Sequence, residues 1–500
     1  MKREIEYLKG FQDFLPQDMI PFQKMLDKVR QVYESYGFRP QMTPVIEALS
    51  LLEGEEGETG KQIYRMEDKE GNRLGLRFDL TMPLSRIITL YAKELRFPYK
   101  RYQYGRVFRY DKPRPGRFRE FGQFDGDIIG SSSILADGEI CALIRDVMRT
   151  LGFSHFLVRV NSRKILTGLA QKLDLQDSQK DKQLFRELDK LDKQGWKQVK
   201  KTLLTGVHEE KKASIGFQLT PKQVDMVEEY LAISAPIQWE PAEEGKREIP
   251  QFYSYEKILK NLEDFFGENQ AGRLGMEELQ GLMDFLAEED QSWLQIDTNI
   301  ARGLDYYTGP VFETVLVDHP GYGAVYSGGR YDFLLGRFID FKSFFKEFQE
   351  YRQKWKDPLT GQPILPAVGA SLGIDRLFAI LKDLKLLQPV KTLTQVLVVT
   401  MDTNLFLECR QIAEKLRHHG IVAELYTGES RSIKHQLRYA DRLEIPLALL
   451  YGENEHKENV VAIKDLRKDR EDKTKQKPIP KEKMVSEIQK LLGETSGDSH

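Results

Sequence analysis

Residues 106–130, RVFRYDKPRPGRFREFGQFDGDIIG, crowd arginines and aromatic side chains around two prolines and then turn acidic and apolar. The pattern predicts a strand, a loop at KPRPG and a second strand that returns beside the first. Between Lys100 and Glu120 stand eight cations against two anions, a local excess of 8 − 2 = +6. The cations are Lys100, Arg101, Arg106, Arg109, Lys112, Arg114, Arg117 and Arg119, and the anions are Asp111 and Glu120.

Composition alone leaves two interpretations of this cationic hairpin open. It could be a solvated hairpin at a sheet edge with a charged loop. It could also be an anion-binding site, because arginine dominates over lysine and its planar fork suits bidentate recognition of phosphate. Side chains alternate along a strand, so Arg109 and Val107 share one face and Arg106 lies on the other. An arginine on a semi-buried face needs an anionic partner.

The whole chain has a globular composition. Its 500 residues, 40% of them hydrophobic, predict two or three domains, and a net charge of −2 excludes a grossly basic nucleic-acid coat while allowing local basic patches. Two cysteines far apart permit no disulfide framework, which suits a reducing cytoplasm. We expect no signal peptide, no membrane span and, because no histidines have HExxH-like spacing, no protein-held metal ion.

Periodicity divides the chain into segments of different character. Apolar spacing predicts helices over 18–36, 83–93 and 134–151, and KEGN predicts the turn of a hairpin within 63–80. Lys, Glu, Gln and Leu at helical spacing predict a helical insertion at 165–285. From residue 393 strands alternate with helices, as in a separate α/β domain. We therefore expect catalytic segments at 1–164 and 286–386, an α/β domain at 393–494 and a disordered tail at 495–500.

Three further arginines stand beside glycine or aromatic residues on separate strand-like segments. They are Arg302 in ARGLDYYTGPVFE, Arg330 in GGRYD and Arg376 in GASLGIDR. A glycine pair followed by an arginine is more often a packing feature than a site. Together with the cationic hairpin, however, the three indicate a site for an anionic ligand.

These segments resemble class II aminoacyl-tRNA synthetases, and specifically the histidyl-tRNA synthetase family. GFRPQMTPVIE looks like motif 1 of that class, YGRVFRYDKPRPGRFREFGQFDGDIIG resembles motif 2, and GASLGIDRLFAIL resembles motif 3. ARGLDYYTGPVFE is similar to the family's histidine-specific segment, and KGFQDFLP and LRFDLTMPLSR fit as well. The resemblance covers nearly the whole chain. It implies an α+β fold: the antiparallel sheet of class II synthetases with flanking helices and a helical insertion, followed by a C-terminal α/β anticodon-binding domain.

The resemblance implies an enzyme of protein synthesis, a histidine–tRNA ligase. Histidine would first attack the α-phosphorus of ATP to give histidyl-adenylate, and the tRNA would then take the histidyl group. Both steps need positioning and neutralisation of anionic oxygens more than a strong base. Arg109 is expected on the α-phosphate and the substrate carboxylate, Arg117 toward the β- and γ-phosphates, Arg302 across the α-phosphate and Arg376 against the adenine. Mg²⁺ is expected with the nucleotide, held mainly by its phosphates.

The same resemblance assigns the histidine pocket. Asp79 and Thr81 match the pair that binds the α-ammonium group. Asp127 matches the carboxylate that binds the imidazole, and Gln123 and Tyr307 match its companions; Tyr306 is expected to shape the wall. Arg109 and Arg302 complete the predicted set of histidine-binding residues. Many members of the family carry Glu where this chain has Asp79 or Asp127.

The alternatives and partners follow from the same comparison. Motif 1 implies a homodimer, and the expected location is the cytoplasm. Arg431, Lys434 and Glu453 are candidate tRNA contacts in the C-terminal domain, although exposed charges usually mean only solubility. The alternative function is a catalytically idle relative that regulates histidine biosynthesis or senses uncharged tRNA; such proteins lose motif arginines, whereas Arg109 is present here. Residues 337–364 have no assigned role, and their aromatic side chains suggest packing.

Overall fold

The computed structural model describes residues 8–53, 62–112, 118–175, 178–206, 218–237, 249–286, 292–301, 306–468 and 476–493. Its compact units divide after Leu386: Met25–Leu386 belongs to the first, and Leu387–His500, with Asp13–Lys24, to the second. Among the described helices none is long and apolar enough to cross a membrane. The predicted tail at 495–500 lies outside the described residues.

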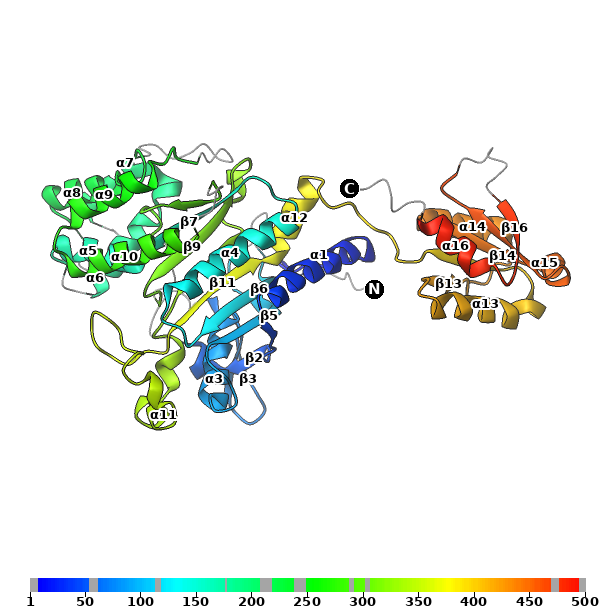
Figure 1. The fold of residues 1–500 in the computed structure, drawn as a ribbon, viewed down its shortest axis with the longest axis horizontal. Helices are drawn as coiled ribbons and strands as arrows, with labels where there is room; N and C mark the ends of the chain where they lie inside the picture. Colours follow the sequence, from blue (N-terminus) through cyan, green and yellow to red (C-terminus); the bar gives the residue numbers. More distant parts are fainter. Residues whose placement is uncertain are drawn as a thin grey trace, which may run out of the picture. The chain divides into compact units, whose positions relative to one another are not determined.

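An eight-stranded sheet forms the centre of the first unit (Figure 1). Its order is β1-β5-β6-β11-β10-β9-β7-β8, and all neighbours are antiparallel except the edge pairs β1–β5 and β7–β8, which are parallel. The predicted antiparallel sheet is therefore confirmed, with parallel strands at its two edges. The strands are β1 (Arg39–Pro40), β5 (Tyr99–Phe108), β6 (Glu120–Ile129), β7 (Phe156–Ser162), β8 (Leu294–Ile296), β9 (Pro310–Leu316), β10 (Tyr326–Arg330) and β11 (Ala367–Gly373).

The cationic hairpin becomes β5 and β6, which lie inside this sheet. In their register Arg101 stands opposite Asp127, and on the other side of β6 Gly369 of β11 stands opposite the same aspartate. Two residues along, Gln103 and Ser371 flank Asp125. Because β6 has neighbours on both sides, the interpretation of a solvated edge hairpin is wrong.

Long helices cover one face of the sheet. They are α4 (Ile134–Thr150) and α12 (Ile374–Asp383), which lie along it in Figure 1, and the part of α1 (Pro16–Ser35) from Met25 onward. Tyr33 of α1 packs against Phe124 of β6, with ring centroids 4.8 Å apart. A Cβ on Gly126 would overlap the Tyr33 ring, so glycine there lets the helix approach β6 closely. The opposite face of β6 is thereby left for Gln123, Asp125 and Asp127.

The predicted hairpin and the first helices are also present. A three-stranded sheet, β2-β4-β3, contains β2 (Ile46–Ala48), β3 (Arg65–Glu67) and β4 (Arg73–Leu76), and α2 (Leu49–Leu52) and α3 (Thr81–Tyr91) follow their strands. Asp68 closes the hairpin turn, because its Oδ1 accepts from the amides of Glu70 and Asn72 at 2.9 and 2.8 Å.

The segment from 163 to 285 is helical over most of its described length, as the periodicity predicted. Its helices are α5 (Arg163–Lys172), α6 (Ser178–Leu188), α7 (Leu191–Thr205), α8 (Pro221–Leu231), α9 (Tyr255–Phe266) and α10 (Gln270–Phe285). Thr220 caps α8 in a capping box with Gln223, and Ser254 and Asn269 cap the next two helices.

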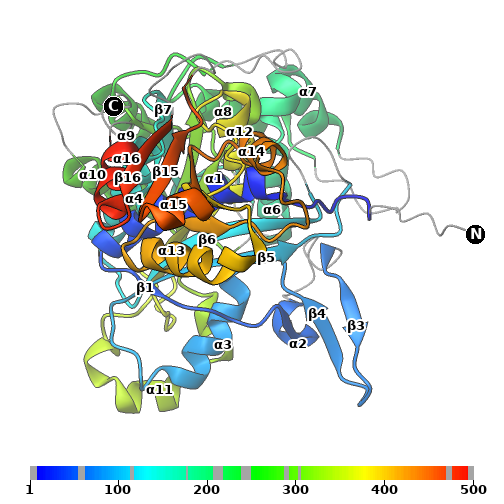
Figure 2. The same cartoon turned by 90° about the vertical axis from the view of Figure 1, so that its right-hand side faces the viewer.

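Residues 337–364, for which the sequence suggested only packing, contribute to the core. This segment contains α11 (Phe341–Glu347) and the 3₁₀ turn Gln349–Tyr351, and the 3₁₀ turn Leu335–Phe338 overlaps its start. Helix α11 lies beside α3 (Figure 2). Trp355 is 2% exposed and stacks on Tyr351 at 4.1 Å, and Phe97 meets the Trp355 ring edge-on at 5.5 Å. The same core holds Phe78 and Met82, which flank the start of α3.

The second unit is an α/β domain around a five-stranded sheet, in the order β13-β12-β14-β15-β16. Its strands are β12 (Val396–Thr400), β13 (Ala423–Leu425), β14 (Leu447–Tyr451), β15 (Val460–Asp465) and β16 (Gln476–Pro480). Its helices are α13 (Phe406–His418), α14 (Ile433–Arg442), α15 (Glu453–Lys457) and α16 (Met484–Gly493), and a 3₁₀ turn precedes α13 at Thr403–Leu405. The first unit has a further 3₁₀ turn at Pro320–Tyr322. Residues 464–483 mix charges of both signs, a pattern that predicts a surface loop. That prediction is wrong for β16, which pairs with β15 although only Ile479 of this strand is buried.

Candidate active site

Gln123, Asp125 and Asp127 lie on one buried face of β6. Their exposed fractions are 8%, 3% and 3%, and burial on this scale is unusual for carboxylates without partners. The amide of Gln123 donates to Ser371 Oγ at 2.9 Å. Burial raises the pKa of Asp125 to about 7, against the opposing effect of Arg101. The face therefore carries acidic groups in an apolar setting.

Asp127 is held by two residues that the resemblance did not include. Its Oδ2 lies 2.6 Å from Nη2 of Arg101, a guanidinium that is 0% exposed, and Tyr331 donates its hydroxyl hydrogen to Oδ1. Burial lowers the pKa of Arg101, but the charges of Asp127 and Asp125 outweigh it and the net shift is upward. Nη2 of Arg101 also donates to the carbonyl of Leu80 at 3.3 Å. This is a buried ion pair, and removing either partner would leave an uncompensated buried charge, which strongly destabilises a protein.

Asp79 lies just before α3 and caps its first turn. Its Oδ1 accepts from the amide of Met82 at 2.9 Å, while Oδ2 has no hydrogen-bond partner in the described part of the chain. Burial raises the pKa of this carboxylate, whereas the Met82 amide and the charges of Arg109 and Arg101 lower it. Thr81 is half-buried. It is the first residue of α3 and therefore lies close to Asp79, which stands two residues before it.

Tyr306 and Tyr307 lie near all three carboxylates. Their rings are 5.0 Å apart in an edge-to-face arrangement, and Tyr306 is 6.0 Å from the ring of Tyr331. Burial raises the pKa of both phenols, and the negative charges of Asp79, Asp125 and Asp127 raise it further. The structure thus brings together seven of the predicted histidine-binding residues. They are Asp79, Thr81, Arg109, Gln123, Asp127, Tyr306 and Tyr307.

The cations of the hairpin divide into internal and peripheral ones. Lys100 pairs with Glu139 and Arg106 pairs with Asp375, both at 2.5 Å, so these charges are neutralised within the protein. Arg109 stands one residue beyond β5; its Nε donates to the Phe78 carbonyl at 3.0 Å, and its guanidinium lies 5.1 Å from the Phe121 ring. Half-buried, this arginine lies within electrostatic reach of Asp79.

The remaining predicted cations are Arg376, Arg117 and Arg302. Arg376 lies in the first turn of α12 and donates to the carbonyl of Ala324 at 2.8 Å. Arg117 and Arg302 lie outside the described residues, so their predicted roles stay predictions.

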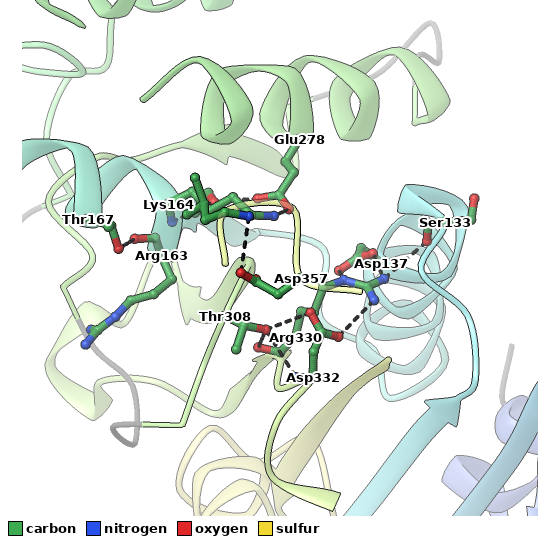
Figure 3. A network of polar contacts seen from close by, with 12 residues as sticks. Ser133, Asp137, Arg163, Lys164, Thr167, Glu278, Thr308, Arg330, Asp332 and Asp357 are labelled. Carbon is green, nitrogen blue, oxygen red and sulfur yellow. Dashed lines mark hydrogen bonds and ion pairs between the residues drawn. The ribbon is translucent and has the colours of Figure 1, made fainter. Parts of the chain in front are cut away.

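Arg330, which follows two glycines in GGRYD, belongs to an internal network (Figure 3). It is 4% exposed and pairs with Asp137 and with Asp332, the latter at 3.3 Å. Asp332 in turn accepts from the hydroxyl of Thr308 at 2.8 Å. Because Thr308 follows Tyr307 directly, this network anchors one end of the tyrosine pair, and Arg330 binds internal carboxylates.

Sequence patterns missed four residues of this site. Arg101, Ser371, Tyr331 and Asp125 received no role in ligand binding. Strand alternation did contain part of the signal, because Arg101, like Arg109, is an even number of residues from Val107. The partners themselves depend on the β5–β6 and β6–β11 registers, which the sequence does not specify.

The arrangement suits a ligand rich in N–H donors. Four buried oxygens of the site, Asp79 Oδ2, Gln123 Oε1, Asp125 Oδ1 and Asp127 Oδ2, have no hydrogen-bond partner among the described residues, and the last of them is ion-paired with Arg101. Buried polar atoms are normally satisfied, so orphaned acceptors near one another indicate a binding site. Arg109, within electrostatic reach of Asp79, provides a complementary cation. The site can therefore bind a cationic amine and a ring N–H together with an anionic group.

Comparisons with known proteins agree with this chemistry. A family model described as "Histidyl-tRNA synthetase" matches residues 10–343, and one described as "Anticodon binding domain" matches residues 395–491. A histidine–tRNA ligase of Clostridium tetani is 36% identical over 93% of this chain and 95% of its own, and one of Rhodopirellula baltica is 37% identical over 92% of each. The crystal structure of a histidyl-tRNA synthetase from Nostoc sp. PCC 7120 superposes with a TM-score of 0.75 at 29% identity, covering 98% of this chain and 100% of that one. The sheet, the acidic face and the matches over both units together show that this chain belongs to the histidyl-tRNA synthetase family.

Proposed function

We propose that this chain ligates L-histidine to its cognate tRNA at the expense of ATP, through a histidyl-adenylate intermediate. The observation that carries the proposal is the set of four buried acceptors, from Asp79, Gln123, Asp125 and Asp127, that have no hydrogen-bond partner among the described residues. Histidine has donors for them: an α-ammonium group and an imidazole N–H. A site built around such hydrogen bonds discriminates strongly, because a side chain that lacks the donor leaves buried groups unpaired.

The anionic half of the reaction would use the arginines. Arg109 is proposed to hold the substrate carboxylate and the α-phosphate, Arg117 the β- and γ-phosphates, and Arg376 the adenine. Arg302 is proposed to stabilise the charge that develops at the α-phosphate in the transition state. No three His, Cys, Asp or Glu side chains of the described residues are grouped to hold a metal ion. A Mg²⁺ ion would accordingly enter with the nucleotide and be held by its phosphates.

We further propose that the protein acts as a homodimer in the cytoplasm. Around β2 several apolar side chains are exposed, which is costly for a monomer and typical of an interface. They are Met42, Val45, Ile46 and Met66, with exposed fractions of 85%, 39%, 46% and 37%. Ile46→Glu should therefore convert a dimer, measured by light scattering after gel filtration, to monomers; Val317→Glu, at another site that is 43% exposed, is the control.

The two units are proposed to divide the work on the tRNA. The second unit, at about 393–494, would bind the anticodon arm, and the insertion at 165–285 would contact the acceptor arm while 1–164 and 286–386 carry the chemistry. An idle relative is disfavoured because Arg109, Arg302 and Arg376 are all present in the sequence.

Histidine-dependent exchange of labelled pyrophosphate into ATP tests the proposal directly. The purified chain should exchange with L-histidine and not with other amino acids, and should charge tRNA(His). Arg109→Gln should lower kcat for exchange about 100-fold or more, the typical cost of removing a charge-stabilising group. The control is Arg96→Gln, on an exposed cation that hydrogen-bonds locally, to the Lys93 carbonyl at 3.2 Å. Absence of histidine-dependent exchange in the unaltered protein would refute the function itself.

A further inference from the structure

Asp125 lies between two members of the proposed histidine pocket, on the same face of β6. Its carboxylate is 3% exposed and stands opposite Ser371 in the β6–β11 register, and Ser371 Oγ accepts a hydrogen bond from Gln123 at 2.9 Å. Asp125 Oδ1 has no hydrogen-bond partner among the described residues.

Asp127, which the resemblance assigned to the imidazole, accepts one hydrogen bond and forms an ion pair, although its Oδ2 has no hydrogen-bond partner among the described residues. Arg101 lies 2.6 Å from Oδ2, and Tyr331 donates to Oδ1. The Arg101 guanidinium balances one negative charge of a pair of carboxylates two residues apart. The pair and its arginine therefore keep one net negative charge when both acids are ionised. Asp125 Oδ1 has neither a hydrogen bond nor an ion pair among the described residues, whereas Asp127 Oδ2 has the ion pair with Arg101.

We propose that Asp125 is a further specificity-determining residue, whose Oδ1 accepts a hydrogen bond from an imidazole N–H of the substrate while Arg101 neutralises Asp127 beside it. The inference rests on the proposed ligase function and deepens it. Tyr306 and Tyr307 lie at the edge of the same region, because the negative charges of Asp125 and Asp127 raise the pKa of both phenols. Asp79 at the start of α3 is left for the α-ammonium group.

Two substitutions of similar volume separate the acceptor from the charge. Asp125→Asn keeps an acceptor oxygen and removes the charge; Asp125→Leu removes both. In pyrophosphate exchange the KM for histidine should rise about 10-fold for Asn and about 100-fold or more for Leu, the scale expected when a hydrogen bond involving a charged group is lost. The KM for ATP should change less than about twofold.

The same variants distinguish binding from a structural role. Both remove a buried charge, so the melting temperature at pH 8 should stay or rise while histidine binding weakens. Thr314→Val is the matched control: Thr314 is buried in β9, its hydroxyl has no hydrogen-bond partner among the described residues, and it pairs with Tyr326 in the sheet. It should leave the KM for histidine unchanged.

Two results would overturn the inference. One is an unchanged histidine KM in Asp125→Leu. The other is a parallel rise in both KM values with a lowered melting temperature, which would make Asp125 structural. If the unaltered protein fails to exchange with histidine, the ligase function has failed and not this assignment alone.

Discussion

Gly369 of β11 stands directly opposite Asp127 of β6, and a Cβ built on this glycine would overlap the Asp127 carboxylate. The carboxylate that the family resemblance places against the substrate imidazole therefore lies over a bare backbone. Gly329 of β10 is the next residue in the same row, and a Cβ there would come 3.0 Å from the Tyr307 ring. Two neighbouring glycines thus make the space in which Asp127 and Tyr307 approach the sheet.

Gly369→Ala should displace Asp127 from Tyr331 and Arg101. We expect a loss of about 1–3 kcal/mol in the free energy of unfolding, typical of overpacking, and at least about a tenfold rise in the KM for histidine. Urea denaturation and pyrophosphate exchange measure the two effects. Gly281→Ala is the control: it lies in α10 with no neighbouring atom closer than 3.4 Å, and should be neutral or slightly stabilising. A normal histidine KM in the Gly369→Ala variant would contradict this account of the glycine.

The acidic face should make stability depend on pH. Burial raises the pKa of Asp125 to about 7, so between pH of about 4 and 7 the folded chain holds a proton that the unfolded chain has released. Stability from this group is therefore full below pH of about 4, falls as pH rises to about 7 and is constant above it. Asp125→Asn should flatten that part of the profile, measured as melting temperature from pH 5 to pH 8. A profile identical to that of the unaltered protein would contradict the assignment.

Trp355→Ala should destabilise the first unit. The indole is 2% exposed between Tyr351 and Phe97, and removing such a side chain costs about 3–5 kcal/mol. Phe338→Ala, at a residue that is 42% exposed, should cost less than about 0.5 kcal/mol. Equal denaturation midpoints for the two variants would mean that residues 337–364 are not part of the core.

Lys434→Ala tests the proposed role of the second unit. Lys434 is exposed in the first turn of α14, whereas the neighbouring Arg431 is engaged with Thr400 at 2.8 Å and lies 4.6 Å from the Phe406 ring. If Lys434 contacts a phosphate of the tRNA, the KM for tRNA should rise about three- to tenfold and its salt dependence should weaken. Pyrophosphate exchange needs no tRNA and should not change. A normal tRNA KM would remove Lys434 from the set of RNA contacts.

Local patterns predicted the elements well and their partners poorly. Helical spacing predicted α1 and α4, and KEGN predicted the β3–β4 turn, because these depend on residues close in the chain. β16 was missed because it has only one buried residue and no alternation to detect. The aromatic run near Trp355 has no strand or long-helix period, so its burial could be suspected but not located.

The sequence by itself determined the class of chemistry: arginines at class II motif positions, carboxylates on one face of a strand and a histidine-specific segment. It also determined which residues alternate onto the same face, since the period of a strand is local. Only the tertiary structure decided which charges are internal. Arg106 and Arg330 find carboxylates 269 and 193 residues away and Arg101 finds Asp127 on the neighbouring strand, whereas Asp125 retains an oxygen unused by the described residues. Strand register and helix packing set those pairings. The partner that they bring to a buried charge determines whether that charge is neutralised within the protein or is left to interact with a ligand.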